Sequence, residues 1–315
     1  ADFIHLHNHS DFSLQDGAQS VQMLCDRCDD LKMESIALTE HGNLFSMIPF
    51  YKTAREKGLK PILGCEIYVS VGNHTDKKQI TTPTGKKWGY NHLVLLVQNQ
   101  IGYKNLIKLV SIGYLEGFYY RPRVDKALLK KYNEGLICTS ACLAGEINQF
   151  ASQNNYESAK KAALEYAEIF PNRFYLEIQN HQIPEELATH SILIRLSEEL
   201  NIPLVATNDC HYALEEHWEA HDILFCLGTD KNRSDPNRLR YEPRQFYIKS
   251  ADEMNLLFSN TPNALENTLK IAESCNLDIT MGKYHLPAFP ITPTNGNQES
   301  EDPDEYLKRL CEMGL

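Results

Sequence analysis

The chain has 315 residues, 42% of them hydrophobic and 23% charged, so it can bury a full core and is neither a disordered nor a fibrous protein. Its formal net charge of -11 disfavours a protein that holds nucleic acid by broad electrostatic attraction, because phosphate binding needs clustered lysines and arginines. It has no apolar run long enough to span a bilayer and no signal-peptide pattern at its first residues, so we expect a soluble, cytoplasmic protein without membrane contact.

Short apolar runs alternate with segments of helical periodicity along most of the chain. Buried strands are predicted at 3–6, 35–39, 61–69, 93–97, 136–139, 174–178 and 202–206. Helices are predicted between them at 20–31, 44–57, 103–115, 156–169 and 184–200. Because crossovers between parallel strands need a helix and closure removes the sheet edges, this order predicts an α/β fold with a parallel barrel of about seven strands.

Two segments interrupt this alternation. Residues 70–90 are polar, contain turn residues and four lysines, and read as an exposed hairpin or mobile insert. The insert is either a solvated loop or a flap that contacts phosphates. From residue 283 the composition becomes that of a linker, and Asp304 begins a helical pattern. We therefore expect one domain over 1–282 and a separate region over 283–315.

The nine cysteines are odd in number and lack the spacing of a disulfide framework, so we expect reduced thiols. Cys25 and Cys28 match the gap of a zinc knuckle, but no second cysteine pair completes such a site, and helix packing is the preferred interpretation. Cys138 lies inside an apolar run, whereas Cys142 lies just past it on the loop side. Cys142 is therefore the candidate metal ligand.

Side chains that bind metal ions stand at or near the ends of most predicted strands, usually the C-terminal end. In chain order they are His7, His9, Asp16, His41, Glu66, His92, Cys142, Asp209 and His211. In barrels of parallel strands the active site lies at the C-terminal ends of the strands. Since imidazole, carboxylate and thiolate are metal-binding groups, we expect one polynuclear site fed by many strands.

The first strand carries three histidines on one face, because side chains alternate along a strand. His7 and His9 are nearest its open end, whereas His5 lies about 7 Å deeper by strand rise and is a pore-filling or second-shell group. Glu66 has two oxygens and could bridge two ions. Glu40 could orient its neighbour His41. We assign no metal role to the histidines outside this pattern, which are His74, His190, His217, His221 and His285.

Eight motifs in order resemble the polymerase and histidinol phosphatase (PHP) domain, in the version carried by the alpha subunit of bacterial replicative DNA polymerases. They include His7-Asn-His9-Ser, Leu14-Gln-Asp16-Gly-Ala, Thr39-Glu-His41-Gly, Gly64-Cys-Glu66-Ile-Tyr, Ser140-Ala-Cys142-Leu-Ala-Gly and Thr207-Asn-Asp209-Cys-His211-Tyr. The resemblance implies a distorted, TIM-like (β/α)7 barrel with a trinuclear metal site. One departure is Glu40, where the family usually has Asp.

The resemblance also implies how the ligands divide among three divalent ions. His7, His9, Glu66 and Asp209 would hold the first ion, and Glu66, His92 and Cys142 the second. Asp16, His41 and His211 would hold the third. This mixture of imidazole, carboxylate and thiolate favours zinc or manganese, with iron also compatible, over magnesium. A hydroxide held by the ions, rather than a side chain, would be the nucleophile in phosphoester hydrolysis.

The polymerase context of the family implies a 3′→5′ exonuclease that removes nucleotides from the 3′ end of DNA during proofreading. Arg121 and Arg123 would position phosphates while a neighbouring tyrosine stacks on a base, or they would form salt bridges near the rim. His181 would line the same opening. The remainder of the polymerase alpha subunit is the implied partner, and the family's polymerase aspartates lie beyond the last residue of this sequence, so we expect no primer extension.

Two other functions remain open from the sequence. The first is a structural module that stabilises the polymerase and docks a separate proofreading exonuclease subunit, with the metal serving the fold. The intact ligand set is the feature against it, since a structural site needs neither three ions nor an open position. The second is a small-molecule phosphatase of the histidinol phosphate type, against which stand the Arg121-Pro-Arg123 segment and the lysine-bearing insert.

Overall fold

The computed structural model describes residues 2–78, 89–238, 240–241, 243–284, 286–287, 289–291 and 302–315. The chain divides into two compact units, Ala1–Asp278 and Ile279–Leu315. Of the insert predicted at 70–90, residues 79–88 lie outside the described part, including Lys86 and Lys87. Among the described residues, no helix is both long and apolar enough to cross a membrane.

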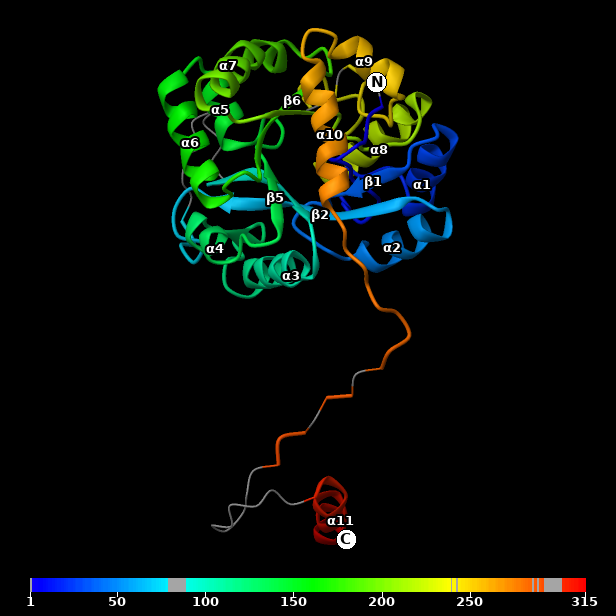
Figure 1. The fold of residues 1–315 in the computed structure, drawn as a ribbon. Helices are drawn as coiled ribbons and strands as arrows, with labels where there is room; N and C mark the ends of the chain where they lie inside the picture. The colour runs from blue at the N-terminus through cyan, green and yellow to red at the C-terminus, as the bar shows by residue number, and fades with distance from the viewer. Residues whose placement is uncertain are drawn as a thin grey trace. The chain divides into compact units, whose positions relative to one another are not determined.

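The first unit contains a curled sheet surrounded by helices, as Figure 1 shows. Its strands are β1 Ser35–Leu38, β2 Lys60–Ser70, β3 Tyr90–Val97, β4 Arg123–Val124, β5 Leu136–Thr139, β6 Phe174–Gln179 and β7 Leu204–Thr207. They pair in the order β1-β2-β3-β5-β6-β7, and the short β4 pairs with β2. The α/β barrel-like class predicted from the sequence is confirmed.

The sheet is not wholly parallel, which corrects one expectation. β3 runs antiparallel to both β2 and β5, while the pairs β1–β2, β5–β6 and β6–β7 are parallel. No helix lies in the described residues between β2 and β3, and antiparallel neighbours need no crossover helix. The reversal places the first residues of β3 beside the last residues of β2, with His92 opposite Tyr68.

The first apolar run is extended but forms no regular strand ladder. It is held by a few backbone hydrogen bonds on both sides: the Ala37 amide donates to the His5 carbonyl at 3.0 Å, and the His9 amide donates to the Cys210 carbonyl at 2.8 Å. The Cys210 amide donates in turn to the His7 carbonyl at 3.2 Å. This segment therefore joins β1 to the end of β7 and closes the barrel. We call this junction of residues 5–9 with Ala37 and Cys210 the seam.

Helices cover the outside of the sheet. They are α1 Val21–Asp30, α2 Met47–Glu56, α3 Gln100–Leu115, α4 Lys126–Lys131, α5 Glu146–Ser152, α6 Tyr156–Ile169, α7 Pro184–Leu200, α8 Trp218–Gly228, α9 Ala251–Leu257 and α10 Pro262–Ser274, with the 3-10 turn η1 Glu215–His217 before α8. The five predicted helices match α1, α2, α3, α6 and α7, whereas α4, α5 and α9 have six or seven residues and are too short for a periodic pattern. The second unit contains α11 Pro303–Gly314, where the sequence pattern predicted a helix from Asp304.

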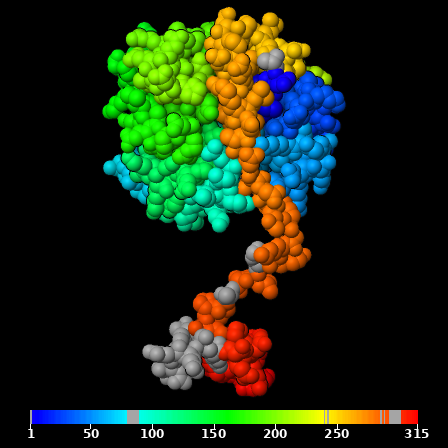
Figure 2. Space-filling view, in the orientation of Figure 1, coloured from blue at the N-terminus to red at the C-terminus, as the bar shows by residue number. Residues whose placement is uncertain are grey.

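Helix α10 closes the end of the barrel at which the strands begin. The Asn267 amide donates to the Leu204 carbonyl at the start of β7, and the Lys60 ammonium at the start of β2 donates to the Ala272 carbonyl. Ile271 and Ala272 belong to the same buried apolar cluster as the strand residues that fill the barrel. Figure 2 shows α10 as a continuous band of side chains on this face. The opposite rim is left to the polar residues at the strand ends.

Candidate metal centre

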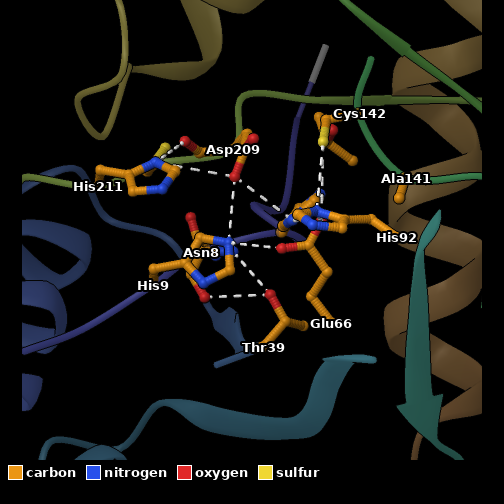
Figure 3. Close-up of polar contacts among 12 residues, drawn as sticks. Asn8, His9, Thr39, Glu66, His92, Ala141, Cys142, Asp209 and His211 are labelled. Carbon is orange, nitrogen blue, oxygen red and sulfur yellow. Dashed lines mark hydrogen bonds and ion pairs between the residues drawn. The ribbon is translucent and has the colours of Figure 1, made fainter. Parts of the chain in front are cut away.

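The structure brings all nine predicted ligands together at the rim opposite α10. They come from the N-terminal segment (His7 and His9), the loop before α1 (Asp16), the loop after β1 (His41), the interior of β2 (Glu66), the start of β3 (His92), and the loops after β5 and β7 (Cys142, Asp209 and His211). His92 joins this rim from the first residues of its strand because β3 is reversed. Figure 3 shows Glu66 and Asp209 directed toward the same space as the rings of His9, His92 and His211.

Glu66 is the central residue of the cluster and is fully buried. One of its carboxylate oxygens, Oε2, lies 2.6 Å from His41 Nδ1 and 3.5 Å from His9 Nε2. The other, Oε1, lies 2.8 Å from His92 Nδ1 and 3.5 Å from His7 Nε2. Each oxygen thus faces a different pair of imidazoles, which is the arrangement that a carboxylate shared between two ions requires.

Asp209 completes the group beside the seam. Its Oδ1 lies 3.1 Å from His9 Nε2 and 3.3 Å from His7 Nε2. Its backbone has φ +41°, in the left-handed region that a residue with a Cβ seldom adopts. Such strained residues concentrate at functional sites, where surrounding contacts hold them in place. This backbone conformation turns the chain sharply after β7.

The other ligands extend the cluster on two sides. Cys142 Sγ lies 3.7 Å from Glu66 Oε1 and 3.8 Å from His92 Nδ1, and Asp16 Oδ2 lies 3.3 Å from His41 Nε2. Three groups have ligand atoms within 4.8 Å of one another: His7, His9 and Glu66; His41, Glu66 and His92; and His9, His41 and His211. In the third group His9 stands where the family resemblance implies Asp16, so this group differs from the implied one in one residue.

The donor atoms fit metal ions because several of them face one another at ion-pair distance without forming hydrogen bonds. Among the described residues, buried side-chain nitrogens and oxygens without a hydrogen-bond partner include His7 Nε2, His9 Nε2, Asp16 Oδ1, both His41 nitrogens, Glu66 Oε2, Asp209 Oδ1 and His211 Nε2. Burying an unpaired polar atom costs about 1–3 kcal/mol, and native structures rarely tolerate many together. Bound cations would satisfy these atoms, all of which belong to types that ligate metals.

The charges in the cluster are strongly coupled. Burial lowers the pKa of His7, but the carboxylates of Asp209, Glu177 and Glu66 outweigh it and raise the pKa well above its usual value. The pKa of Glu66 is held well below its usual value, despite burial, by His92, His41 and His7. Burial and the neighbouring carboxylate of Glu66 raise the pKa of the Cys142 thiol. In the protein alone, protons therefore occupy positions that a metal ion would take over.

Glu177 orients His7, and the sequence reasoning missed it. It lies inside β6, is 1% exposed, and one carboxylate oxygen accepts from His7 Nδ1 at 2.7 Å. The same carboxylate accepts from Gln179 Nε2 at 2.9 Å and from the hydroxyls of Thr139 and Thr207. A carboxylate behind a histidine fixes which nitrogen faces the metal. The available signal was a single charged residue within an apolar strand.

The two predicted second-shell residues have other partners. The Glu40 carboxylate accepts from the hydroxyls of Ser10, Ser13 and Ser46, and the Ser13 oxygen accepts from the His41 amide at 3.1 Å. Glu40 thus acts on His41 through Ser13. His5 is fully buried and its Nε2 lies 2.8 Å from the Lys249 carbonyl, so it fills the interior of the barrel below the ligands.

Of the predicted substrate contacts, the structure places one beside the ligands. Arg121 lines a cavity of about 320 Å³ together with Asp16, His41 and His92. Its guanidinium donates to Gln15 Oε1 at 2.6 Å. Much of the remaining wall is aromatic and includes Phe45, Tyr68, Tyr90, Tyr114, Phe118 and Tyr120. We call this space the aromatic cavity.

Arg123 and His181 lie elsewhere. Arg123 is 1% exposed, and its guanidinium donates to the carbonyls of Gly117, His74 and Asp76, so it holds loops together. His181 is fully buried, with Nδ1 2.7 Å from Glu186 Oε1 and Nε2 2.9 Å from the Asn208 carbonyl. Both predicted substrate contacts therefore have their polar atoms occupied within the protein, and we do not retain them as such.

A curled α/β barrel whose rim gathers histidines, carboxylates and a cysteine defines a candidate polynuclear metal-binding domain. The chain belongs to the PHP domain family, whose model matches residues 5–181. The resemblance seen in the sequence is thereby confirmed.

The curated relatives carry the name DNA polymerase III subunit alpha. The relative from Borreliella burgdorferi is 48% identical over 99% of this chain and 27% of that protein. Those from Treponema pallidum and Campylobacter jejuni are 42% and 40% identical, again over 99% of this chain and 26% and 27% of the relatives. The chain thus spans about a quarter of the length of the relatives it matches. A solved structure from Bacteroides vulgatus is described as containing a predicted PHP-like metal-dependent phosphoesterase. It is 16% identical over 67% of this chain and 54% of that chain, with a TM-score of 0.41.

Proposed function

We propose that this chain is a metal-dependent phosphodiesterase that acts as a 3′→5′ exonuclease on DNA. The observation that carries the proposal is the convergence of nine ligating side chains, with their unpartnered buried atoms, at a rim that opens into the aromatic cavity. The polymerase name of the relatives supports a DNA substrate, and the proposed setting is proofreading during replication in the cytoplasm.

The nine predicted ligands are proposed to hold three divalent ions, zinc or manganese by their chemistry, with iron also compatible. When bound, such ions would activate water and stabilise the charge that develops on the phosphoryl oxygens. Glu66 would be shared between ions because its oxygens face different imidazoles. Glu177 would keep His7 Nε2 turned toward the centre by accepting the proton of Nδ1.

The aromatic cavity is proposed to receive the terminal nucleotide. Phe118 and Tyr120 are 48% and 55% exposed, so their rings would be able to stack on a base. Arg121 lies between this aromatic wall and the ligands, with its guanidinium 5.8 Å from the Tyr68 ring centroid. An arginine at this place would pair with the phosphate that precedes the scissile bond. The protein would then hold the DNA strand through local contacts, because its acidic overall charge disfavours broad electrostatic attraction.

The first test is release of mononucleotides from a 3′-labelled, mismatched primer by the purified chain with added manganese or zinc. We expect release by the parent and by the exposed-carboxylate control Asp252→Asn, and none by Asp209→Asn. Metal content should be measured for each protein. Absence of release by metal-loaded parent protein would reject the nuclease. Kinetics with small phosphomonoesters in the same assay separate a phosphatase of the histidinol phosphate type.

A second candidate function has one observation in its favour. Four ligands flank the seam, with His7 and His9 on one side and Asp209 and His211 on the other, so bound metal would hold the barrel closed. The domain would then be a structural module that stabilises the rest of the polymerase subunit and docks a separate exonuclease subunit. Under this alternative, Asp209→Asn lowers thermal stability while the metal-loaded parent releases no nucleotide.

A further inference from the structure

A second and larger cavity adjoins the same rim and has no role in the proposed site so far. It has a volume of about 920 Å³ and lies between the η1–α8 segment and the described residues of 233–238, 240–241 and 243–245. Four arginines line it: Arg233, Arg238, Arg240 and Arg244. Only two acidic residues, Glu215 and Asp222, are among its described lining residues. This is a local excess of positive charge in a chain with formal net charge -11. We call it the arginine pocket.

The arginine pocket is continuous with the metal rim through two rings. His221 and Tyr241 both line the pocket, and their ring centroids lie 5.6 and 5.3 Å from that of the ligand His211. The Tyr241 phenol is close enough to the ligand carboxylates of Asp16 and Asp209 that they add to the effect of burial in raising its pKa. A ligand in the arginine pocket would therefore reach the centre from the side of His211.

Two of the arginines are paired with carboxylates. Asp222 accepts two hydrogen bonds from Arg238, at 2.6 and 2.7 Å. Arg233 lies 2.7 Å from Glu219 and 3.3 Å from Asp222. Arg244 is exposed and its guanidinium carbon lies 3.4 Å from the ring centroid of Trp218. A stacked guanidinium keeps its edge available for bidentate pairing with phosphate.

One buried polar atom at this pocket also lacks a partner. His221 is 2% exposed, and its Nε2 has no hydrogen-bond partner within the protein. Buried polar atoms without partners are rare in native structures, and an occupied ligand site is one explanation. His221 lies outside the ligand pattern in the sequence and was assigned no metal role. Its place between the arginines and His211 points to a ligand that spans both.

We propose that the arginine pocket binds the phosphodiester backbone of the single DNA strand whose 3′ end enters the metal centre. This inference rests on the proposed exonuclease function and extends it, because it makes the enzyme specific for a polynucleotide over a mononucleotide. Arg240 and Arg244, both exposed, pair with phosphates. The volume lies within the range of sites that enclose a drug-sized ligand and holds a short stretch of strand.

The test measures binding without hydrolysis, so that it does not depend on catalysis. The full chain, kept in EDTA, is titrated into a fluorescein-labelled single-stranded oligothymidylate, and anisotropy is recorded over a series of salt concentrations. For the double variant Arg240→Ala/Arg244→Ala we expect about tenfold weaker binding at low salt. We also expect its log–log salt slope to be smaller by about 1.4, because each phosphate contact on a single strand contributes about 0.7.

The matched control is Arg55→Ala/Arg195→Ala. It removes the same charge from two arginines that also stack on aromatic rings, those of Tyr51 and Tyr156, but line neither cavity. This control must bind like the parent. Emission of Trp218, recorded in a Trp88→Phe background, must change on addition of the oligonucleotide. Circular dichroism confirms that each variant is folded.

Three results would overturn the proposal. They are parent-like binding by Arg240→Ala/Arg244→Ala, no binding of the oligonucleotide by the parent, and equally tight binding of an acidic peptide such as polyglutamate. Failure of the exonuclease function gives a different result, since a protein that binds DNA here in EDTA yet releases no nucleotide with metal retains the pocket and loses only the catalysis.

Discussion

Replacing Glu177 with glutamine tests whether the buried carboxylate behind His7 controls the metal centre. Glu177→Gln keeps the shape of the side chain but removes its charge. All four neighbours of the carboxylate donate to it: His7, Gln179 and the hydroxyls of Thr139 and Thr207. The amide nitrogen of glutamine would face one of these donors, and His7 would lose the charge that keeps its proton on Nδ1. Such outer-shell changes cost about 10- to 100-fold in metal affinity, or about 1.4–2.7 kcal/mol.

The assay is competition for zinc against a chelating dye, with stoichiometry and affinity fitted for each protein. The control is Glu186→Gln, which removes another buried carboxylate paired with a buried histidine, at 2.7 Å from His181 Nδ1, but outside the ligand cluster. We expect the control to bind zinc like the parent. Equal zinc affinity in Glu177→Gln and the parent, with both proteins folded, would refute the orienting role.

Three further results are expected. Uptake of zinc in a weakly buffered solution should release protons, and zinc affinity should fall as pH falls, because Asp209 and Glu66 raise the pKa of His7 in the metal-free protein. A pH-indicator titration measures the proton release. Zinc binding without proton release would contradict the prediction. Arg123→Ala should lower the free energy of unfolding by about 2–4 kcal/mol through three lost bonds to carbonyls, whereas Arg121→Ala should change it by less than about 0.5 kcal/mol and instead slow nucleotide release. Burial lowers the pKa of Lys249 to about 8, so the unfolded chain binds more protons between pH 8 and 10.5. The stability of the parent relative to Lys249→Met should therefore rise across that window by about 3 kcal/mol in denaturant titrations. A flat difference would be inconsistent with the burial.

The ligand set was predictable because its chemistry is local in the sequence. His7, His9, Asp209 and His211 stand in pairs next to apolar runs, and such pairs at strand ends indicate metal binding whatever the order of the strands. The direction of β3 was a different matter. The polar insert after β2 has no helical period and already favoured a hairpin, but the regular alternation elsewhere outweighed it.

Residues whose roles depend on distant backbone could not be assigned in advance. Arg123 looked like a phosphate contact because it follows Arg121 by two residues, yet its partners are carbonyls at Gly117, His74 and Asp76. His181 is likewise fixed by Asn208, which lies on another strand end. Nothing in the sequence near these residues reports such partners, since they exist only after the barrel has closed.

The seam gives the metal ions a second consequence. An ion held by His7, His9 and Asp209 would tie the first extended segment to the turn after the last strand, which are joined by the two backbone hydrogen bonds of Cys210 with His7 and His9. Such an ion would act as a removable crosslink between the two ends of the sheet. The stabilisation that a crosslink provides is largest for segments as far apart in sequence as these. A descendant that lost these ligands would need another way to fasten the cylinder, such as larger apolar side chains across the junction. The number of ions bound would then set how tightly the barrel is closed.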